Sequence, residues 1–209
     1  MHARQWVLSL VLLLFMAAQA DAQGEIHPAV ERVRGLTETL SQAMNASELD
    51  FSGRYDLIRP VVEDLFALEL MARLSTGRYW RDLSPDQREQ LISLYADWSA
   101  ASYANRFDEP GSTFEVNPEV TRTNQGILVE SSLLRPDNGS VAFTYMLRPA
   151  ESKWRIFDIR VRGVSQLANT RAQFVPLLKN EGFDGLVRSI REKIEDLSGP
   201  DAGQSIVPE

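Results

Sequence analysis

The sequence predicts a single α+β domain in which helices pack on one face of a four-stranded antiparallel sheet. Three observations support this prediction. Apolar residues recur with a helical period up to about residue 107, the period becomes two between residues 114 and 161, and helical periodicity returns after Gly163. Helices before and after a run of strands are typical of α+β folds, whose helices cover one sheet face.

Two helical patterns precede the most regular one. The first begins after Pro28, with apolar residues at helical spacing: Val30, Val33, Leu40 and Met44. Pro60 is expected to open a second, short helix, because proline is tolerated in a first turn. Its apolar positions continue until Gly77 stops the pattern: Val61, Leu65, Phe66, Leu70, Met71 and Leu74.

The next helix has the clearest start signal. Residues 84–87 read Ser-Pro-Asp-Gln, which is a capping box with proline in the first turn. The helix is expected to run to about Phe107, and its apolar positions are Leu91, Leu94, Tyr95 and Trp98.

Four strands are expected next, rich in β-branched and aromatic residues, at 114–120, 127–134, 141–147 and 154–161. Residues 136–139, Pro-Asp-Asn-Gly, predict a turn that makes the second and third strands an antiparallel hairpin. In the third strand the odd positions from Val141 to Leu147 are apolar and share one face. The opposite face, which begins at Ala142, is expected to be more exposed to solvent.

Two helices should close the domain. Ser165 can cap the first, and Pro176 is expected to kink or break it. Residues 182–185, Gly-Phe-Asp-Gly, should start the last helix, and residues 199–209 read as a flexible tail.

The first 22 residues have the pattern of a cleavable secretory signal peptide: Arg4, a short apolar stretch, and Ala-Asp-Ala before Gln23. A single domain, residues 23–198, would then act outside the cytoplasm. The net charge of −7 disfavours nucleic acid as a partner and predicts that anionic membranes are met through a docking protein.

Composition excludes several kinds of chemistry. The chain has no Cys, and its two His are His2 and His27, so the usual nucleophile–His systems and thiolate zinc sites lack their residues. No glycine-rich nucleotide motif is present. The acidic residues form no recognisable catalytic carboxylate pair. We expect no enzyme, no metal and no cofactor.

The apolar faces of the sheet and of at least three helices must meet. They can form an ordinary core, or they can enclose a lipid-sized cavity, and periodicity does not separate the two.

Several motifs lie in order along the chain, at residues 70–73, 77–81, 83–88, 153–165, 169–174 and 182–186. Taken together they resemble the MlaC (toluene-tolerance) family of periplasmic phospholipid-binding proteins, and the resemblance spans about residues 28–197. It departs from the family pattern at Ala67, Arg162 and Thr170. The spacing around Leu167 and Phe174 is also similar to a hopanoid-associated (HpnM-like) branch.

The resemblance implies a periplasmic carrier that encloses phospholipid acyl chains in an apolar pocket between sheet and helices. Its implied partners are an outer-membrane lipoprotein complex and an inner-membrane ABC transporter with an MCE-type component. Transport of a hopanoid is the alternative cargo, and a periplasmic adaptor that binds only protein is the second alternative.

Ten residues are candidates to contact the lipid, with ordinary core packing as the alternative for each: Phe66, Met71, Leu74, Leu94, Trp98, Tyr103, Phe143, Tyr145, Leu167 and Phe174. Arg160, Arg162 and Arg171 are candidates to contact a headgroup or a docking partner. For Arg171 an internal salt bridge to Asp158 is slightly preferred.

Overall fold

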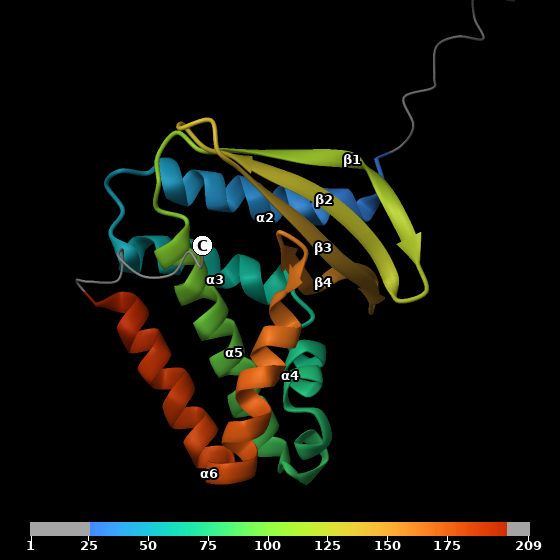
Figure 1. The fold of residues 1–209 in the computed structure, drawn as a ribbon, viewed down its shortest axis with the longest axis vertical. Helices are drawn as coiled ribbons and strands as arrows, with labels where there is room; N and C mark the ends of the chain where they lie inside the picture. The colour runs from blue at the N-terminus through green and yellow to red at the C-terminus, as the bar shows by residue number, and fades with distance from the viewer. Residues whose placement is uncertain (1–25, 200–209) are drawn as a thin grey trace, which may run out of the picture.

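A twisted antiparallel sheet forms one layer of the molecule, and helices cover one of its faces (Figure 1). The structure is a computed structural model and describes residues 26–199. The expected signal peptide, residues 1–22, lies outside the described residues, as does the expected tail beyond Gly199.

The sheet has five strands within residues 26–199, in the order in which they occur along the chain. They are β1 (Thr113–Thr123), β2 (Gly126–Leu134), β3 (Ser140–Ala150), β4 (Lys153–Val161) and β5 (Val164–Ser165). The four predicted strands are present. The prediction of only four is wrong, because a turn at Arg162 and Gly163, both with positive φ, brings two more residues back onto β4. A two-residue strand is too short to show a period of two.

The register of β3 and β4 decides which side chains face the helices. Phe143 pairs with Val161 and Tyr145 with Ile159, so these four residues share the inner face. Between them Thr144 pairs with Arg160 on the outer face. The predicted alternation of β3 holds except at Met146, which lies on the outer face and is nevertheless buried.

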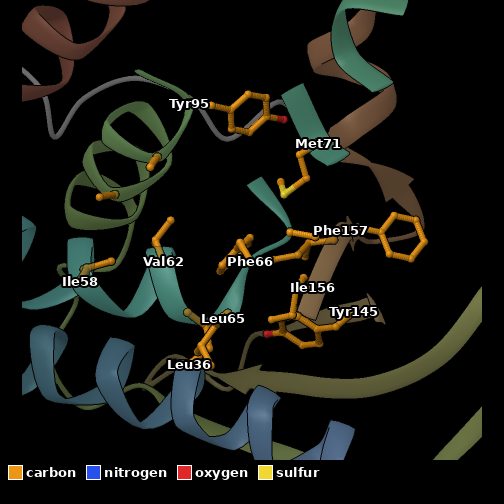
Figure 2. Packing of buried hydrophobic residues seen from close by; sticks show 14 of the residues in the cluster. Leu36, Ile58, Val62, Leu65, Phe66, Met71, Tyr95, Tyr145, Ile156 and Phe157 are labelled. Carbon is orange, nitrogen blue, oxygen red and sulfur yellow. The ribbon is translucent and has the colours of Figure 1, made fainter. Parts of the chain in front are cut away.

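Helix α2 (Pro28–Asn45) runs beneath the sheet and buries the predicted stripe against it (Figure 1). Figure 2 shows Leu36 of this helix in the same layer as Leu65, Phe66, Tyr145 and Ile156. This layer is the core between the sheet and the helices.

Helix α3 (Phe51–Leu65) begins nine residues before the predicted start at Pro60. Asp50 is its N-cap and accepts a hydrogen bond from the Gly53 amide at 2.9 Å. Pro60 lies inside the helix, so the prediction that it opens a helix is wrong. The buried Ile58 and Val62, one turn apart around the proline, hold the helix against the core despite the missing N–H.

The predicted pattern from Pro60 to Gly77 is divided between two helices. After α3 the chain extends at Phe66 and bridges to Ile156 of β4, with the Ala67 amide donating to the Ile156 carbonyl at 2.8 Å. Helix α4 (Leu68–Thr76) and the 3₁₀ helix η1 (Gly77–Asp82) follow.

Helix α5 (Pro85–Arg106) confirms the capping box, in which Ser84 and Gln87 exchange bonds of 2.9 and 3.2 Å. Helix α6 (Gln166–Ser198) folds back on itself as a hairpin (Figure 1). The break falls at Gly182, which has φ 71° and ψ −166°, and the helix runs unbroken through Pro176. Of the predicted kink or break at Pro176, the break is therefore wrong, whereas the predicted new start at residue 182 is confirmed.

None of the helices in residues 26–199 is long and apolar enough to cross a membrane.

Candidate functional site

A small cavity of about 30 Å³ lies between the inner face of the sheet and the helices. It is bounded by α2, the end of α5, strands β3 and β4, and the first residue of α6. Ten side chains line it: Leu36, Leu40, Tyr103, Arg106, Phe107, Phe143, Tyr145, Ile159, Val161 and Gln166. Eight of the ten are aliphatic or aromatic. A space of this size is about that of one water molecule.

Aromatic rings form a continuous wall beside this cavity. Phe66 lies 6.1 Å from Tyr103, ring centre to ring centre, and Tyr103 lies 5.9 Å from Phe107. Phe107 lies 6.4 Å from Phe143, which stacks on Tyr145 at 6.2 Å. We call these five residues the sheet-side cluster. Offset and tilted ring pairs at these separations are attractive beyond the area that they bury.

The two tyrosines of the sheet-side cluster place hydroxyl groups in an otherwise apolar layer. Ser131 Oγ donates to the Tyr145 hydroxyl at 3.2 Å. Burial raises the pKa of Tyr145 to about 12, because the phenolate would lose its hydration. Burial also raises the pKa of Tyr103. Both phenols are therefore neutral over the physiological pH range.

A second aromatic group lies between α5 and α6. Phe174 is 6.1 Å from Tyr95 and 5.8 Å from Trp98. We call these three residues the inter-helix cluster. The Tyr95 hydroxyl and Ser75 Oγ are 3.4 Å apart, and Lys193 lies 5.5 Å from the Trp98 ring centre. None of the three lines the cavity described above.

The ten predicted lipid contacts thus fall into separate places. Tyr103, Phe143 and Tyr145 line the cavity, and Phe66 is one ring removed from it. Trp98 and Phe174 belong to the inter-helix cluster. The other four lie on the helices without lining the cavity: Met71, Leu74, Leu94 and Leu167.

The predicted salt bridge from Arg171 to Asp158 is wrong. Arg171 Nη1 donates to the Leu74 carbonyl at 2.8 Å, near the end of α4. Asp158 accepts from Ser165 Oγ at 2.8 Å and from the Leu167 amide at 3.0 Å, and so caps the start of α6. Its only ion pair among the described residues is with Arg160, at 4.0 Å.

The other two predicted cationic contacts lie away from the cavity wall. Arg160 pairs with Thr144 on the outer face of the sheet, whereas the cavity borders the inner face. Arg162 lies in the exposed turn before β5, with φ 50°. Their role as headgroup or partner contacts remains a prediction.

Sequence reasoning missed seven of the lining residues: Leu36, Leu40, Arg106, Phe107, Ile159, Val161 and Gln166. Leu40 was in the predicted stripe of the first helix and Phe107 was the predicted end of the third. What their periodicity could not supply is the pairing of these helix positions with β3 and β4, which depends on the tertiary fold.

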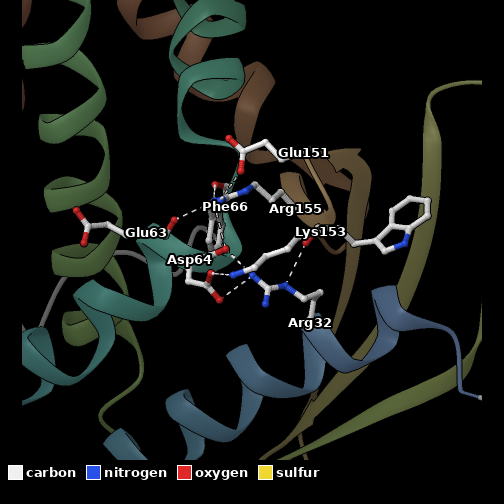
Figure 3. A network of polar contacts seen from close by, with 8 residues as sticks. Arg32, Glu63, Asp64, Phe66, Glu151, Lys153 and Arg155 are labelled. Carbon is white, nitrogen blue, oxygen red and sulfur yellow. Dashed lines mark hydrogen bonds and ion pairs between the residues drawn. The ribbon is translucent and has the colours of Figure 1, made fainter.

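A polar network ties the helices to the sheet at another place (Figure 3). Asp64, at the end of α3, accepts from Arg32 and Lys153, each at 2.8 Å. Arg155 Nη1 donates to the carbonyls of Glu63, Asp64 and Phe66 at 3.1, 3.2 and 3.4 Å. We call Arg32, Asp64, Lys153 and Arg155 the polar clasp. The hydrogen bond from Lys153 is the main reason that the pKa of Asp64 is lowered.

Within the part of the chain that the structure describes, no three His, Cys, Asp or Glu residues are grouped so that they could hold a metal ion.

Comparison with known proteins supplies the family. The family model described as "MlaC protein" matches residues 32–192. The chain belongs to the MlaC family. The matched range contains all ten residues that line the cavity.

One curated protein is similar in sequence, and one solved structure has the same fold. The intermembrane phospholipid transport system binding protein MlaC of Haemophilus influenzae is 21% identical over 211 residues, which cover 90% of this chain and 92% of that protein. A phospholipid-binding protein from Ralstonia solanacearum, solved in complex with a phospholipid, has the same fold with a TM-score of 0.72. The match covers 83% of this chain and all of that one, at 16% identity.

Two of the positions where the chain was judged to depart from the MlaC pattern have structural roles. Thr170 is buried and donates to the Gln166 carbonyl at 2.9 Å within α6. Ala67 carries the amide that bonds to Ile156 of β4. Neither position lines the cavity.

Proposed function

We propose that this protein is a periplasmic lipid carrier, which encloses the acyl chains of a phospholipid between the inner face of its sheet and α2 and α5. It would carry the lipid between an outer-membrane lipoprotein complex and an inner-membrane ABC transporter with an MCE-type component. The signal peptide, residues 1–22, would deliver it to the periplasm. The carrier acts by binding, and no catalytic step or cofactor is part of the proposal.

The observation that carries this proposal is the family match over residues 32–192, because it includes every element of the apolar cavity. Both compared relatives support it. One is named as a phospholipid transport binding protein, and the other holds a phospholipid within the same fold.

Physical chemistry explains why such a carrier encloses its cargo. Exposing a methylene group to water costs about 0.8 kcal/mol, so two acyl chains with about thirty methylenes cost on the order of 24 kcal/mol. A lipid in free solution between two membranes is therefore too rare to account for transfer. Release must occur by exchange at a docked partner rather than into water.

The described cavity of about 30 Å³ must widen to receive acyl chains, since sites that enclose ligands of a few hundred daltons measure about 300–1,000 Å³. Apolar contacts across the cavity are non-directional, so acyl chains can replace them at little cost. The hydrogen bonds of the polar clasp have no such replacement in a lipid tail.

The two regions lie at opposite ends of β4, and this suggests where the widening occurs. Lys153 and Arg155 of the clasp are at the start of the strand, and Val161 at its end lines the cavity. We therefore expect the sheet and helices to separate at the Val161 end while the clasp holds the other end together.

Mass spectrometry of the native protein purified from the periplasm tests the proposal. Solvent extraction of the same preparation identifies any released lipid. A two-chain phospholipid bound at one molecule per chain is the expected result. A bound hopanoid would change the identity of the cargo but would still support a lipid carrier. A bound protein partner, with no lipid under several purification conditions, would show that the protein is an adaptor instead.

A further inference from the structure

One residue of the cavity wall differs from the other nine in exposure and charge. Arg106 is exposed, whereas the other lining side chains are buried or half-buried. It lies in the last turn of α5, beside the half-buried Tyr103. Arg106 is therefore the most solvent-accessible part of the cavity wall.

No carboxylate neutralises this arginine. Among the described residues Arg106 forms no ion pair, although Asp108 and Glu109 follow it closely in the sequence. Glu109 pairs instead with Arg135, at 3.8 Å. Although the chain has a net charge of −7, the cavity wall thus carries a positive charge that no ion pair among the described residues neutralises.

We propose that Arg106 binds the phosphodiester of the lipid whose acyl chains enter the cavity. This inference rests on the proposed carrier function and adds the recognition of the headgroup to it. A phospholipid has its phosphate where its chains begin, so chains directed inward from this side place the phosphate at Arg106. The planar guanidinium donates two parallel hydrogen bonds to phosphate oxygens and is more weakly hydrated than an ammonium group.

The alternative is that Arg106 has only a structural role, and Arg73 provides the comparison that tests it. A cation in the last turn of a helix interacts favourably with the helix dipole, and Arg73 lies in the last turn of α4. Arg73 is also exposed and forms no ion pair among the described residues, but it does not line the cavity. Arg73→Gln is thus a control for Arg106→Gln, with the same charge change in the last turn of a helix.

The experiment measures binding of two fluorescent lipids to purified, delipidated protein. Phosphatidylglycerol and diacylglycerol carry the same acyl chains and the same fluorophore, and differ in the presence of the phosphate. We expect Arg106→Gln to weaken phosphatidylglycerol binding about tenfold, which corresponds to about 1.4 kcal/mol. Its affinity for diacylglycerol should be unchanged, and Arg73→Gln should change neither affinity.

The other outcomes separate the two proposals. Wild-type protein that binds neither lipid refutes the carrier function itself. Equal weakening of both lipids by Arg106→Gln, or equal effects of the two variants, leaves the carrier intact and overturns headgroup binding by Arg106. Calorimetry with inorganic phosphate alone is the last arm: binding as tight as that of phosphatidylglycerol, lost in Arg106→Gln, would make this a free-anion site and also overturn the inference.

Discussion

The sheet-side cluster and the inter-helix cluster are built from similar residues but differ in their surroundings. The inter-helix cluster packs between α5 and α6, with Phe174 only 1% exposed and the half-buried Trp98 lying under Lys193. The sheet-side cluster borders a cavity whose wall includes the exposed Arg106. An aromatic residue at helical or strand spacing therefore does not reveal whether it packs or binds. Whether such a residue packs or binds depends on the space beside it and on the access of solvent to that space.

The largest expected effect is on stability, in the inter-helix cluster. Phe174→Ala should lower the free energy of unfolding by about 3–5 kcal/mol, because a fully buried ring is removed from between α5 and α6. Urea denaturation measures it. Lipid bound per folded molecule should stay at the wild-type value, and its loss would place the inter-helix cluster in the binding site.

The same truncation in the sheet-side cluster should act on lipid retention. Phe143→Ala removes a ring from the cavity wall, and we expect about a tenfold weaker retention of phospholipid, or about 1.4 kcal/mol. Fluorescent-lipid titration below the melting temperature measures it, with Phe174→Ala as the matched control. If both variants retain lipid equally well, Phe143 is ordinary core and the two clusters do not differ in function.

Alkaline titration sharpens the comparison through Tyr145. Its folded pKa of about 12 exceeds the unfolded value of about 10, so the folded state holds the proton more tightly. Its contribution to stability is complete below pH 10 and is lost as the pH rises toward 12. Tyr145→Phe should make unfolding less pH-dependent in that window, by up to about 1.4 kcal/mol per pH unit.

Two observations accompany this test. At neutral pH Tyr145→Phe should cost about 1 kcal/mol, because the Ser131 hydroxyl loses its acceptor. Tyr95 and Tyr103 are still present in the variant, and burial also raises their pKa values. Part of the loss of stability at alkaline pH should therefore persist. An unchanged pH profile would show that Tyr145 is solvated.

The smallest effect is expected at the polar clasp. Asp64→Asn removes two ion pairs of a half-exposed carboxylate, so the free energy of unfolding should fall by only about 0.5–1 kcal/mol at neutral pH. Since the folded pKa is lowered, the contribution is present above about pH 4 and disappears as the pH falls. A change in lipid affinity of more than a few-fold would show that the clasp does more than hold one end of the sheet.

Much of the fold could be predicted from local patterns. The capping box at Ser84, the stripe of α2 and the turn at residues 136–139 each depend on residues close in sequence, and each is confirmed. Pro60 and Pro176 could not be interpreted in this way. Both lie inside helices that are held by packing, and Gly182 makes the break because glycine tolerates a positive φ.

The site was less predictable, since it depends on contacts between distant segments. Tyr103 and Tyr145, which the sequence analysis predicts to contact lipid, border the cavity, and the lipid contact itself stays a prediction. The separation of Trp98 and Phe174 from them follows from the way in which α6 packs on α5, which no single stripe encodes. Likewise Arg171 binds a backbone carbonyl, and because every residue has one, the sequence does not indicate which carbonyl accepts the bond.

The most direct test of the central claim is photocrosslinking with a phospholipid that carries a diazirine in its acyl chain. Peptide mapping by mass spectrometry then locates the attached residues. The account predicts adducts on the cavity wall, at Leu36, Phe107, Phe143 or Ile159. Adducts confined to Trp98 and Phe174, or to the outer face of the sheet, would contradict it.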